Sequence, residues 1–222
     1  MEKEIINLRN INKNYDQQCI LNNVNLTIKS KKIYVIMGPS GSGKSTLLNI
    51  ISMIEKPSSG NYYWESRNLE ELTSTEKSLI RQKNIGLIFQ EFNLFEELTT
   101  FENLNVYLKL TTSLNEVVRK AKIIEEAKKL NIEEILHKKV KFLSGGERQR
   151  ITIARCYLND TELILADEPS ANIDSKNKEI LISSFLSLKN CGKTIIIVTH
   201  DEIYKSIADV IYNLKDGKLI EY

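Results

Sequence analysis

The stretch Gly38-Pro39-Ser40-Gly41-Ser42-Gly43-Lys44-Ser45-Thr46 decides the fold of this chain. It matches the pattern G-x-x-x-x-G-K-[ST] in full, which predicts a loop that binds a nucleotide phosphate. The apolar run Ile33–Met37 leads into the loop, and we expect a helix to begin near Lys44. Strand, loop and helix therefore follow in the order that a phosphate cradle requires. An ordinary glycine-serine turn before a helix is the alternative explanation.

The residue types in this loop suit the chemistry of a phosphate. Glycines allow consecutive backbone N–H groups to point at the phosphate, and the start of the helix adds a favourable dipole. We expect Lys44 to reach the β- and γ-phosphates of ATP and Ser45 to ligate Mg²⁺. The chain has only nine glycines, and five lie in this loop and in a second segment, Leu143-Ser144-Gly145-Gly146-Glu147.

Further strands are expected on both sides of the middle of the chain. Short apolar runs at 85–89, 163–166 and 195–198 are typical of strands buried on both faces of a parallel sheet. Residues 24–28 alternate between apolar and polar, which predicts a small, half-exposed antiparallel sheet near the N-terminus. Asp216-Gly217 predicts a hairpin near the other end. The predicted fold class is α/β, with a P-loop NTPase core.

Residues 91–145 follow a helical period instead. One apolar stripe is spaced three or four residues apart, with Lys and Glu between its members: Val117, Ala121, Ile124, Ala127 and Leu130. We therefore expect one domain over 1–222, in which an α/β nucleotide-binding core (1–90 and 146–222) carries an inserted helical subdomain (91–145).

Polar residues follow two of the predicted strands. An Asp at the end of such a strand holds Mg²⁺ in P-loop NTPases, and Asp167 fits this role. We expect Glu168 to polarise the water that attacks the γ-phosphate, a general-base role worth about 10²–10⁴-fold in rate. Two solvated acids that open a loop are the alternative. His200 also lies at a strand end, where a neutral imidazole would orient water or Glu168, although a lone histidine is often structural.

The second glycine segment precedes a predicted helix over 148–158. Ser144 and the N–H groups of Gly145 and Gly146 would form another anion site at the start of this helix. A plain Ser/Gly helix cap is the alternative.

Together, 38–46, Gln90, 143–147, 163–168 and His200 resemble, in order and spacing, the ATP-binding subunit of ABC transporters. The resemblance covers almost the whole chain. It implies an ATPase in which the signature loop of one copy, Ser144 to Glu147, contacts the γ-phosphate of an ATP held by the P-loop of another. Two copies would then close head to tail on two ATP molecules, as a homodimer.

The resemblance also assigns single residues. Tyr15 would place its ring against adenine, with a tyrosine packed inside the small sheet as the alternative. Gln90 would contact Mg²⁺ or the attacking water and couple the site to the helical insertion, an assignment that rests on the resemblance alone. Asp174 would lie in a loop that contacts the other copy. In that loop Ser170 and Ala171 replace the family's usual Thr and Gly.

Composition limits the partners. Lys and Arg number 31 against 29 acids, a net charge of +2 that carries no nucleic-acid signature. The three cysteines are scattered, which indicates neither a disulfide framework nor a zinc site. The start of the chain is too polar for a signal peptide, and no stretch reaches the ~18 apolar residues that span a bilayer. A membrane role therefore calls for an integral permease on a separate chain, with this protein at the cytoplasmic face of the membrane.

The segment after Gln90 is most similar to one branch of the family, which includes macrolide, antimicrobial-peptide and bacteriocin export and lipoprotein release. This implies an exporter whose cargo is a peptide, a lipoprotein or an amphipathic drug. Phe92, Leu94 and Phe95 would receive a coupling helix of the permease, or else fill the core of the helical subdomain. The alternative function is a regulatory ATPase that transmits force to a membrane partner without transport.

Overall fold

A computed structural model describes residues 2–171 and 173–222, and Met1 and Asn172 lie outside the described residues. Four strands within residues 4–68 form an antiparallel sheet in the order β2-β1-β4-β5. Its strands are β1 (Glu4–Tyr15), β2 (Gln18–Lys29), β4 (Ser59–Trp64) and β5 (Arg67–Asn68). Val24, Leu26 and Ile28 are buried while Asn25 is exposed, so the alternation predicted for this sheet is confirmed.

A second sheet has the order β10-β9-β3-β8-β7-β6. Neighbours from β9 to β6 run parallel, and β10 pairs antiparallel with β9. The turn between them contains Asp216 (φ 49°) and Gly217 (φ 72°), which confirms the predicted hairpin. The strands are β3 (Ile33–Met37), β6 (Ile85–Ile88), β7 (Leu163–Asp167), β8 (Thr194–Thr199), β9 (Val210–Lys215) and β10 (Lys218–Glu221).

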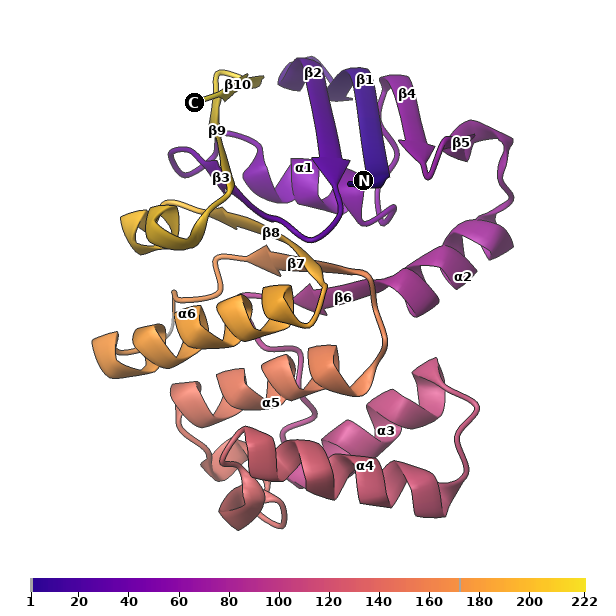
Figure 1. Cartoon of the computed structure of the whole chain (residues 1–222). Coiled ribbons are helices and arrows are strands. Elements are labelled where there is room, and N and C mark those ends of the chain that lie inside the picture. Colours follow the sequence, from indigo (N-terminus) through magenta and orange to yellow (C-terminus); the bar gives the residue numbers. More distant parts are fainter. Residues whose placement is uncertain (1, 172) are drawn as a thin grey trace.

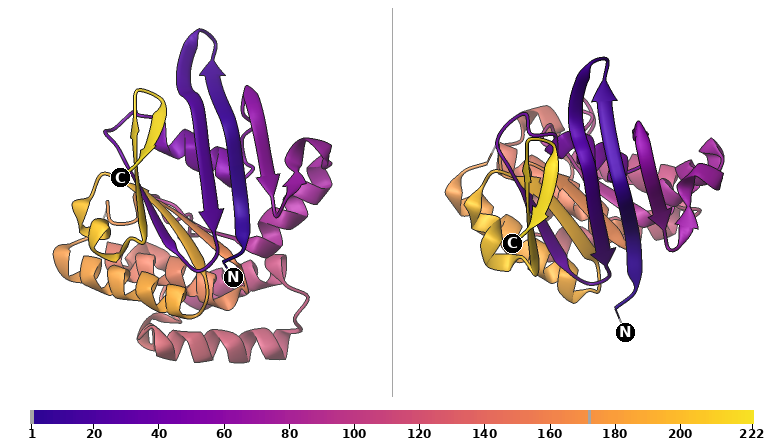
Figure 2. Two further views of the ribbon diagram at one scale, coloured as in Figure 1. Left: turned by 45° about the horizontal axis from the view of Figure 1, so that its top comes forward. Right: turned by 90° about the horizontal axis from the view of Figure 1, so that it is seen from above.

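The two sheets enclose α1 (Lys44–Ile51), as Figure 1 shows. Leu47, Leu48 and Ile51 are buried in one hydrophobic core with residues of both sheets. The other face of the parallel sheet is covered by α5 (Gly145–Leu158) and α6 (Ser175–Asn190), which contribute Ile153 and Phe185 to a second core. In both views of Figure 2 the long strands β1 and β2 run side by side and extend past the parallel sheet.

Beyond α5 lies a group of helices at the foot of Figure 1. It contains α3 (Thr100–Thr111) and α4 (Glu116–Lys129), which share a third core with α5. The remaining helix, α2 (Ser74–Asn84), precedes β6. Short 3-10 turns complete the described elements: η1 (Leu69–Glu71), η2 (Glu133–Ile135), η3 (Val140–Phe142) and η4 (Glu202–Ile207). Because α5 packs against both the sheet and the helical group, the division at 145–146 stays a prediction.

The helix predicted around 117–130 is confirmed, but its buried face is partly wrong. Val117 is 78% exposed and Ile124 is 38% exposed, whereas Ile123 and Ala127 are fully buried. Neighbouring isoleucines at 123 and 124 allow two apolar stripes about 100° apart on the helix. Packing of α4 against α3 and α5 selects the stripe through Ile123.

Candidate active site

The glycine loop joins the buried strand β3 to α1, in the predicted order. Gly43 is the N-cap of α1 and has φ 98°, a conformation that favours glycine. No side chain caps this helix start, so its first N–H groups remain available to an anion. Lys44 is buried, and its Nζ donates to the carbonyl oxygens of Gly38 (2.9 Å) and Pro39 (3.0 Å). The loop is thus folded around an ammonium group, as a phosphate cradle requires.

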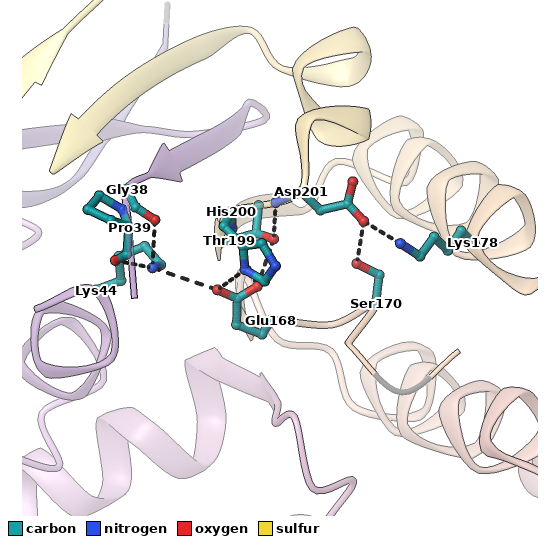
Figure 3. A network of polar contacts seen from close by, with 9 residues as sticks. All are labelled: Gly38, Pro39, Lys44, Glu168, Ser170, Lys178, Thr199, His200 and Asp201. Carbon is teal, nitrogen blue, oxygen red and sulfur yellow. Dashed lines mark hydrogen bonds and ion pairs between the residues drawn. The ribbon is translucent and has the colours of Figure 1, made fainter. Parts of the chain in front are cut away.

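Glu168 lies next to this ammonium group, as Figure 3 shows. Its Oε1 is 3.7 Å from Lys44 Nζ and 3.0 Å from His200 Nδ1. Its Oε2 accepts from the Thr199 hydroxyl at 2.9 Å. The backbone of Glu168 has φ 43°, an uncommon left-handed conformation for a residue that is not glycine, and its N–H donates to Val198 O. The carboxylate is therefore held at the strand end between the P-loop lysine and the end of β8.

Asp167 and Ser45 meet beside Glu168. Burial raises the pKa of Asp167, a hydrogen bond from the Ser45 side chain lowers it, and the charge of Glu168 raises it. Asp167 Oδ1 is buried and has no hydrogen-bond partner among the described residues. A buried oxygen with an unused lone pair, beside a serine hydroxyl, is the donor chemistry that a hard cation such as Mg²⁺ takes. These two residues therefore fit the predicted metal role.

His200 borders open space. Its side chain is 70% exposed, and a cavity of about 510 Å³ lies beside it, lined also by Met37, Gly38 and Pro39. The imidazole contacts Glu168 directly, which supports the predicted orienting role over a purely structural one. Which ring nitrogen carries the proton depends on the tautomer.

The register between β6 and β7 places Gln90 at the same edge of the parallel sheet as Glu168. β6 runs parallel to β7, with Ile88 opposite Ala166, so two residues further along each chain Gln90 is level with Glu168. The strand ends at Ile88, one residue before the predicted end. Gln90 is exposed, as expected for a residue that follows the strand.

Tyr15 ends β1 close to the P-loop. Its hydroxyl bonds the Glu55 carboxylate and has a side-chain hydrogen bond with Thr46, the last residue of the loop. Lys13 Nζ lies 4.9 Å from the ring centroid. The side chain is 46% exposed, so the ring is not packed inside the sheet. Adenine stacking stays a prediction that this exposure favours.

The second glycine segment caps α5. Ser144 is the N-cap, and its hydroxyl accepts from Glu147 N (3.3 Å) while Glu147 Oε2 accepts from Ser144 N (2.8 Å). This capping box starts α5 at Gly145, three residues before the predicted helix start at 148. The helix-cap alternative is thus present in the structure, and an anion role would be additional to it. α5 lies on the opposite face of the parallel sheet from α1, so the two glycine segments begin helices on different faces of the sheet.

Asp174 is the N-cap of α6 and accepts from Asn177 N at 2.9 Å and from Asn177 Nδ2 at 2.9 Å. The loop before it runs from Ser170 to Ile173, and its Asn172 lies outside the described residues.

A group of polar residues that no sequence motif predicted lies behind Glu168. The Thr199 hydroxyl donates to Glu168 and accepts from Asp201 N at 3.0 Å, which orients its proton toward the carboxylate. Asp201 in turn binds Ser170 Oγ (3.1 Å) and Lys178 Nζ (2.6 Å). Figure 3 shows the group spanning β8, the loop after β7 and α6. The only signal in the sequence was Asp201 beside His200, because tertiary folding brings the other members together.

Comparison with known proteins identifies the class. A family model described as ABC transporter matches residues 21–171. The chain is 40% identical over 97% of its length to the uncharacterized ABC transporter ATP-binding protein MJ0796 of Methanocaldococcus jannaschii and covers 95% of that protein. It is also 40% identical to the macrolide export ATP-binding/permease protein MacB of Campylobacter jejuni, again over 97% of this chain, but spans only 34% of that relative's length.

Solved structures agree with this assignment. The dimeric post-hydrolysis structure of MJ0796 with ADP and Pi superimposes with a TM-score of 0.90 at 37% identity, over 98% of both chains. The chain therefore belongs to the ABC transporter ATP-binding family. It has the α/β P-loop fold of that family, binds ATP and is an ATPase. No helix within residues 2–171 and 173–222 combines the length and apolarity needed to cross a bilayer.

Proposed function

We propose that this chain is the ATP-hydrolysing subunit of a membrane exporter and that two copies close head to tail on two ATP molecules. The supporting observation is that the two glycine segments begin helices on different faces of the parallel sheet. Lys44, Asp167 and Glu168 gather at one end of the parallel sheet, while the signature helix α5 lies on the face of the sheet opposite α1. A P-loop half and a signature half on one chain are complete only when a second copy supplies the other half.

In this proposal each group has one task. Lys44 and the start of α1 bind the β- and γ-phosphates, and Ser45 with Asp167 holds Mg²⁺, which neutralises phosphate charge. Glu168 accepts the proton of the attacking water, and His200 and Gln90 orient it. Tyr15 stacks on adenine, and the segment Ser144 to Glu147 of the other copy, with its Asp174, closes the site. Hydrolysis and phosphate loss then release the two copies, so nucleotide state sets their separation.

The central test is Glu168→Gln. This variant should bind Mg²⁺-ATP with the affinity of the parent, lose nearly all turnover and accumulate as a dimer, because the amide cannot accept a proton. ATPase rate, nucleotide titration and light scattering measure the three properties. Turnover at the parent rate would remove Glu168 from the mechanism, and a strictly monomeric protein at saturating Mg²⁺-ATP would remove the dimer.

The membrane partner is proposed to be a permease on a separate chain, with this subunit at the cytoplasmic face. The name of the MacB relative joins an ATP-binding part and a permease in one protein, and this chain matches about a third of it. Of the three residues predicted to receive the coupling helix, Phe95 is 58% exposed, whereas Leu94 packs on the helical core. Phe95 is therefore more accessible to a partner than Leu94. A cavity of about 400 Å³ is lined by Ile54, Leu87, Phe89 and Tyr107, and also by Asn93 of the same segment. We propose that a cytoplasmic segment of the permease docks there.

The cargo is proposed to be a peptide, a lipoprotein or an amphipathic drug. Reconstitution with the co-purifying membrane protein tests this: ATP-dependent movement of one of these compounds across vesicles supports export. ATPase stimulation without movement of any of them would favour the regulatory alternative.

A further inference from the structure

Gly146 of the signature segment meets a side chain of its own molecule. A Cβ at this position would lie 2.4 Å from Asn177 Cγ, 2.5 Å from Oδ1 and 2.6 Å from Nδ2. Contacts this short are not tolerated, so any larger residue at 146 must push Asn177 away. Glycine at 146 therefore matters inside the chain to the extent that Asn177 must keep its place, separately from any close approach of ATP.

Asn177 is not free to move aside without loss. Its Nδ2 donates to Asp174 Oδ2 at 2.9 Å, and its Oδ1 accepts from Arg150 Nη1 at 3.3 Å. Asp174 belongs to the loop at the start of α6, and Arg150 belongs to α5. A single amide thus covers the signature glycine, holds the Asp174 carboxylate and links the two helices.

We propose that Asn177 is a positioning residue that sets the signature segment and the Asp174 loop at a fixed separation, and that Gly146 is glycine so that this amide can lie flat against it. The proposal rests on the proposed function, because both segments act on an ATP held by the second copy. Displacing the amide shifts the two surfaces relative to each other, and they no longer close together on one nucleotide.

A double-mutant cycle in the Glu168→Gln background tests the proposal. Gly146→Ala should raise the ATP concentration for half-maximal dimerisation by about tenfold or more, since it expels Asn177. Asn177→Ala removes the three atoms that clash, so adding Gly146→Ala to Asn177→Ala should change that concentration by less than about threefold. Glu179→Ala, on the exposed side of α6, is the matched control and should behave as the Glu168→Gln parent.

Each outcome is decisive. One contrary outcome is that Gly146→Ala raises the ATP concentration for half-maximal dimerisation by the same factor with Asn177→Ala as without it. In that case the nucleotide itself requires the glycine, and the proposal fails. It also fails if Gly146→Ala dimerises like the parent. If Glu168→Gln alone does not dimerise, the proposed function fails. The same variants are then compared by the midpoint temperature of thermal unfolding of the monomer. Gly146→Ala should lower this temperature, and the decrease should disappear when Asn177→Ala is also present.

Asn177→Asp tests the hydrogen bond to Asp174 separately from the volume of the side chain at 177. It keeps the volume but sets a carboxylate against the carboxylate of Asp174, where the amide had donated. Half-maximal dimerisation should therefore need about tenfold more ATP. An unchanged ATP requirement would show that the bond to Asp174 carries no positioning role.

Discussion

At the scale of residues, Glu168 depends on its neighbours. The Thr199 hydroxyl donates to Glu168 while it accepts from Asp201 N, so its proton has one direction in which to point. Thr199→Val keeps the shape of this strand residue but removes the donor. Because hydrogen bonds to charged groups contribute about 1.5–3 kcal/mol, we expect kcat to fall about 10- to 100-fold with KM for ATP nearly unchanged. Thr27→Val, on β2, is the control. A parallel rise in KM for ATP would instead indicate a collapsed nucleotide site.

Lys44 is expected to contribute most of the positive charge that faces the phosphates. Its Nζ lies within the loop, bonded to two carbonyl oxygens and 3.7 Å from Glu168 Oε1. Lys44→Ala removes the cation that would face the β- and γ-phosphates, so ATP affinity should fall about 10- to 100-fold. Isothermal titration with ATP measures this. An unchanged Kd would contradict the assignment of the loop as a phosphate cradle.

Among the described helices, α2, α3 and α5 begin with the same capping box, which in α2 is formed by Thr73 and Glu76. α3 starts with Thr99 and Glu102, and α5 with Ser144 and Glu147, in equivalent geometry. Thr99→Ala and Ser144→Ala should each lower the free energy of unfolding by about 1 kcal/mol, measured in urea. Only Ser144→Ala should also reduce the ATPase rate, because only its hydroxyl is proposed to face a phosphate. Equal ATPase rates in the two variants would indicate that Ser144 acts only as a helix cap.

In the proposed dimer, each ATP site takes one half from each copy. Lys44→Ala spoils the P-loop half and Ser144→Ala the signature half, so dimers of either variant have no intact site. Mixing them equally creates mixed dimers in about half of the pairs, each with one intact site and one doubly altered site. The mixture should reach about a quarter of the parent ATPase rate, well above either variant alone. If each site lay within one chain, mixing would produce only the average of the two variants.

Local pattern was enough for much of the fold. The glycine loop, the buried strands and the Asp216-Gly217 hairpin follow from short-range sequence, because strand burial and backbone conformation are set by neighbouring residues. The positions of Lys44 at the start of α1 and of Asp167 and Glu168 at the end of β7 were also predictable, since each belongs to a recognisable motif. Local pattern failed for α4, where the neighbouring isoleucines at 123 and 124 left the buried face ambiguous until α3 and α5 packed against it.

The family and the fold class thus followed from the sequence, together with a set of residues proposed to meet the nucleotide, because all of these rest on short motifs. Only the tertiary structure determined how those residues are held. Thr199 and Asp201 lie more than thirty residues from Glu168, and Asn177 lies on a different helix from Gly146. Such contacts join segments that are distant in sequence, and no local periodicity records them. They exist only once β7 and β8 pair and α5 packs against α6.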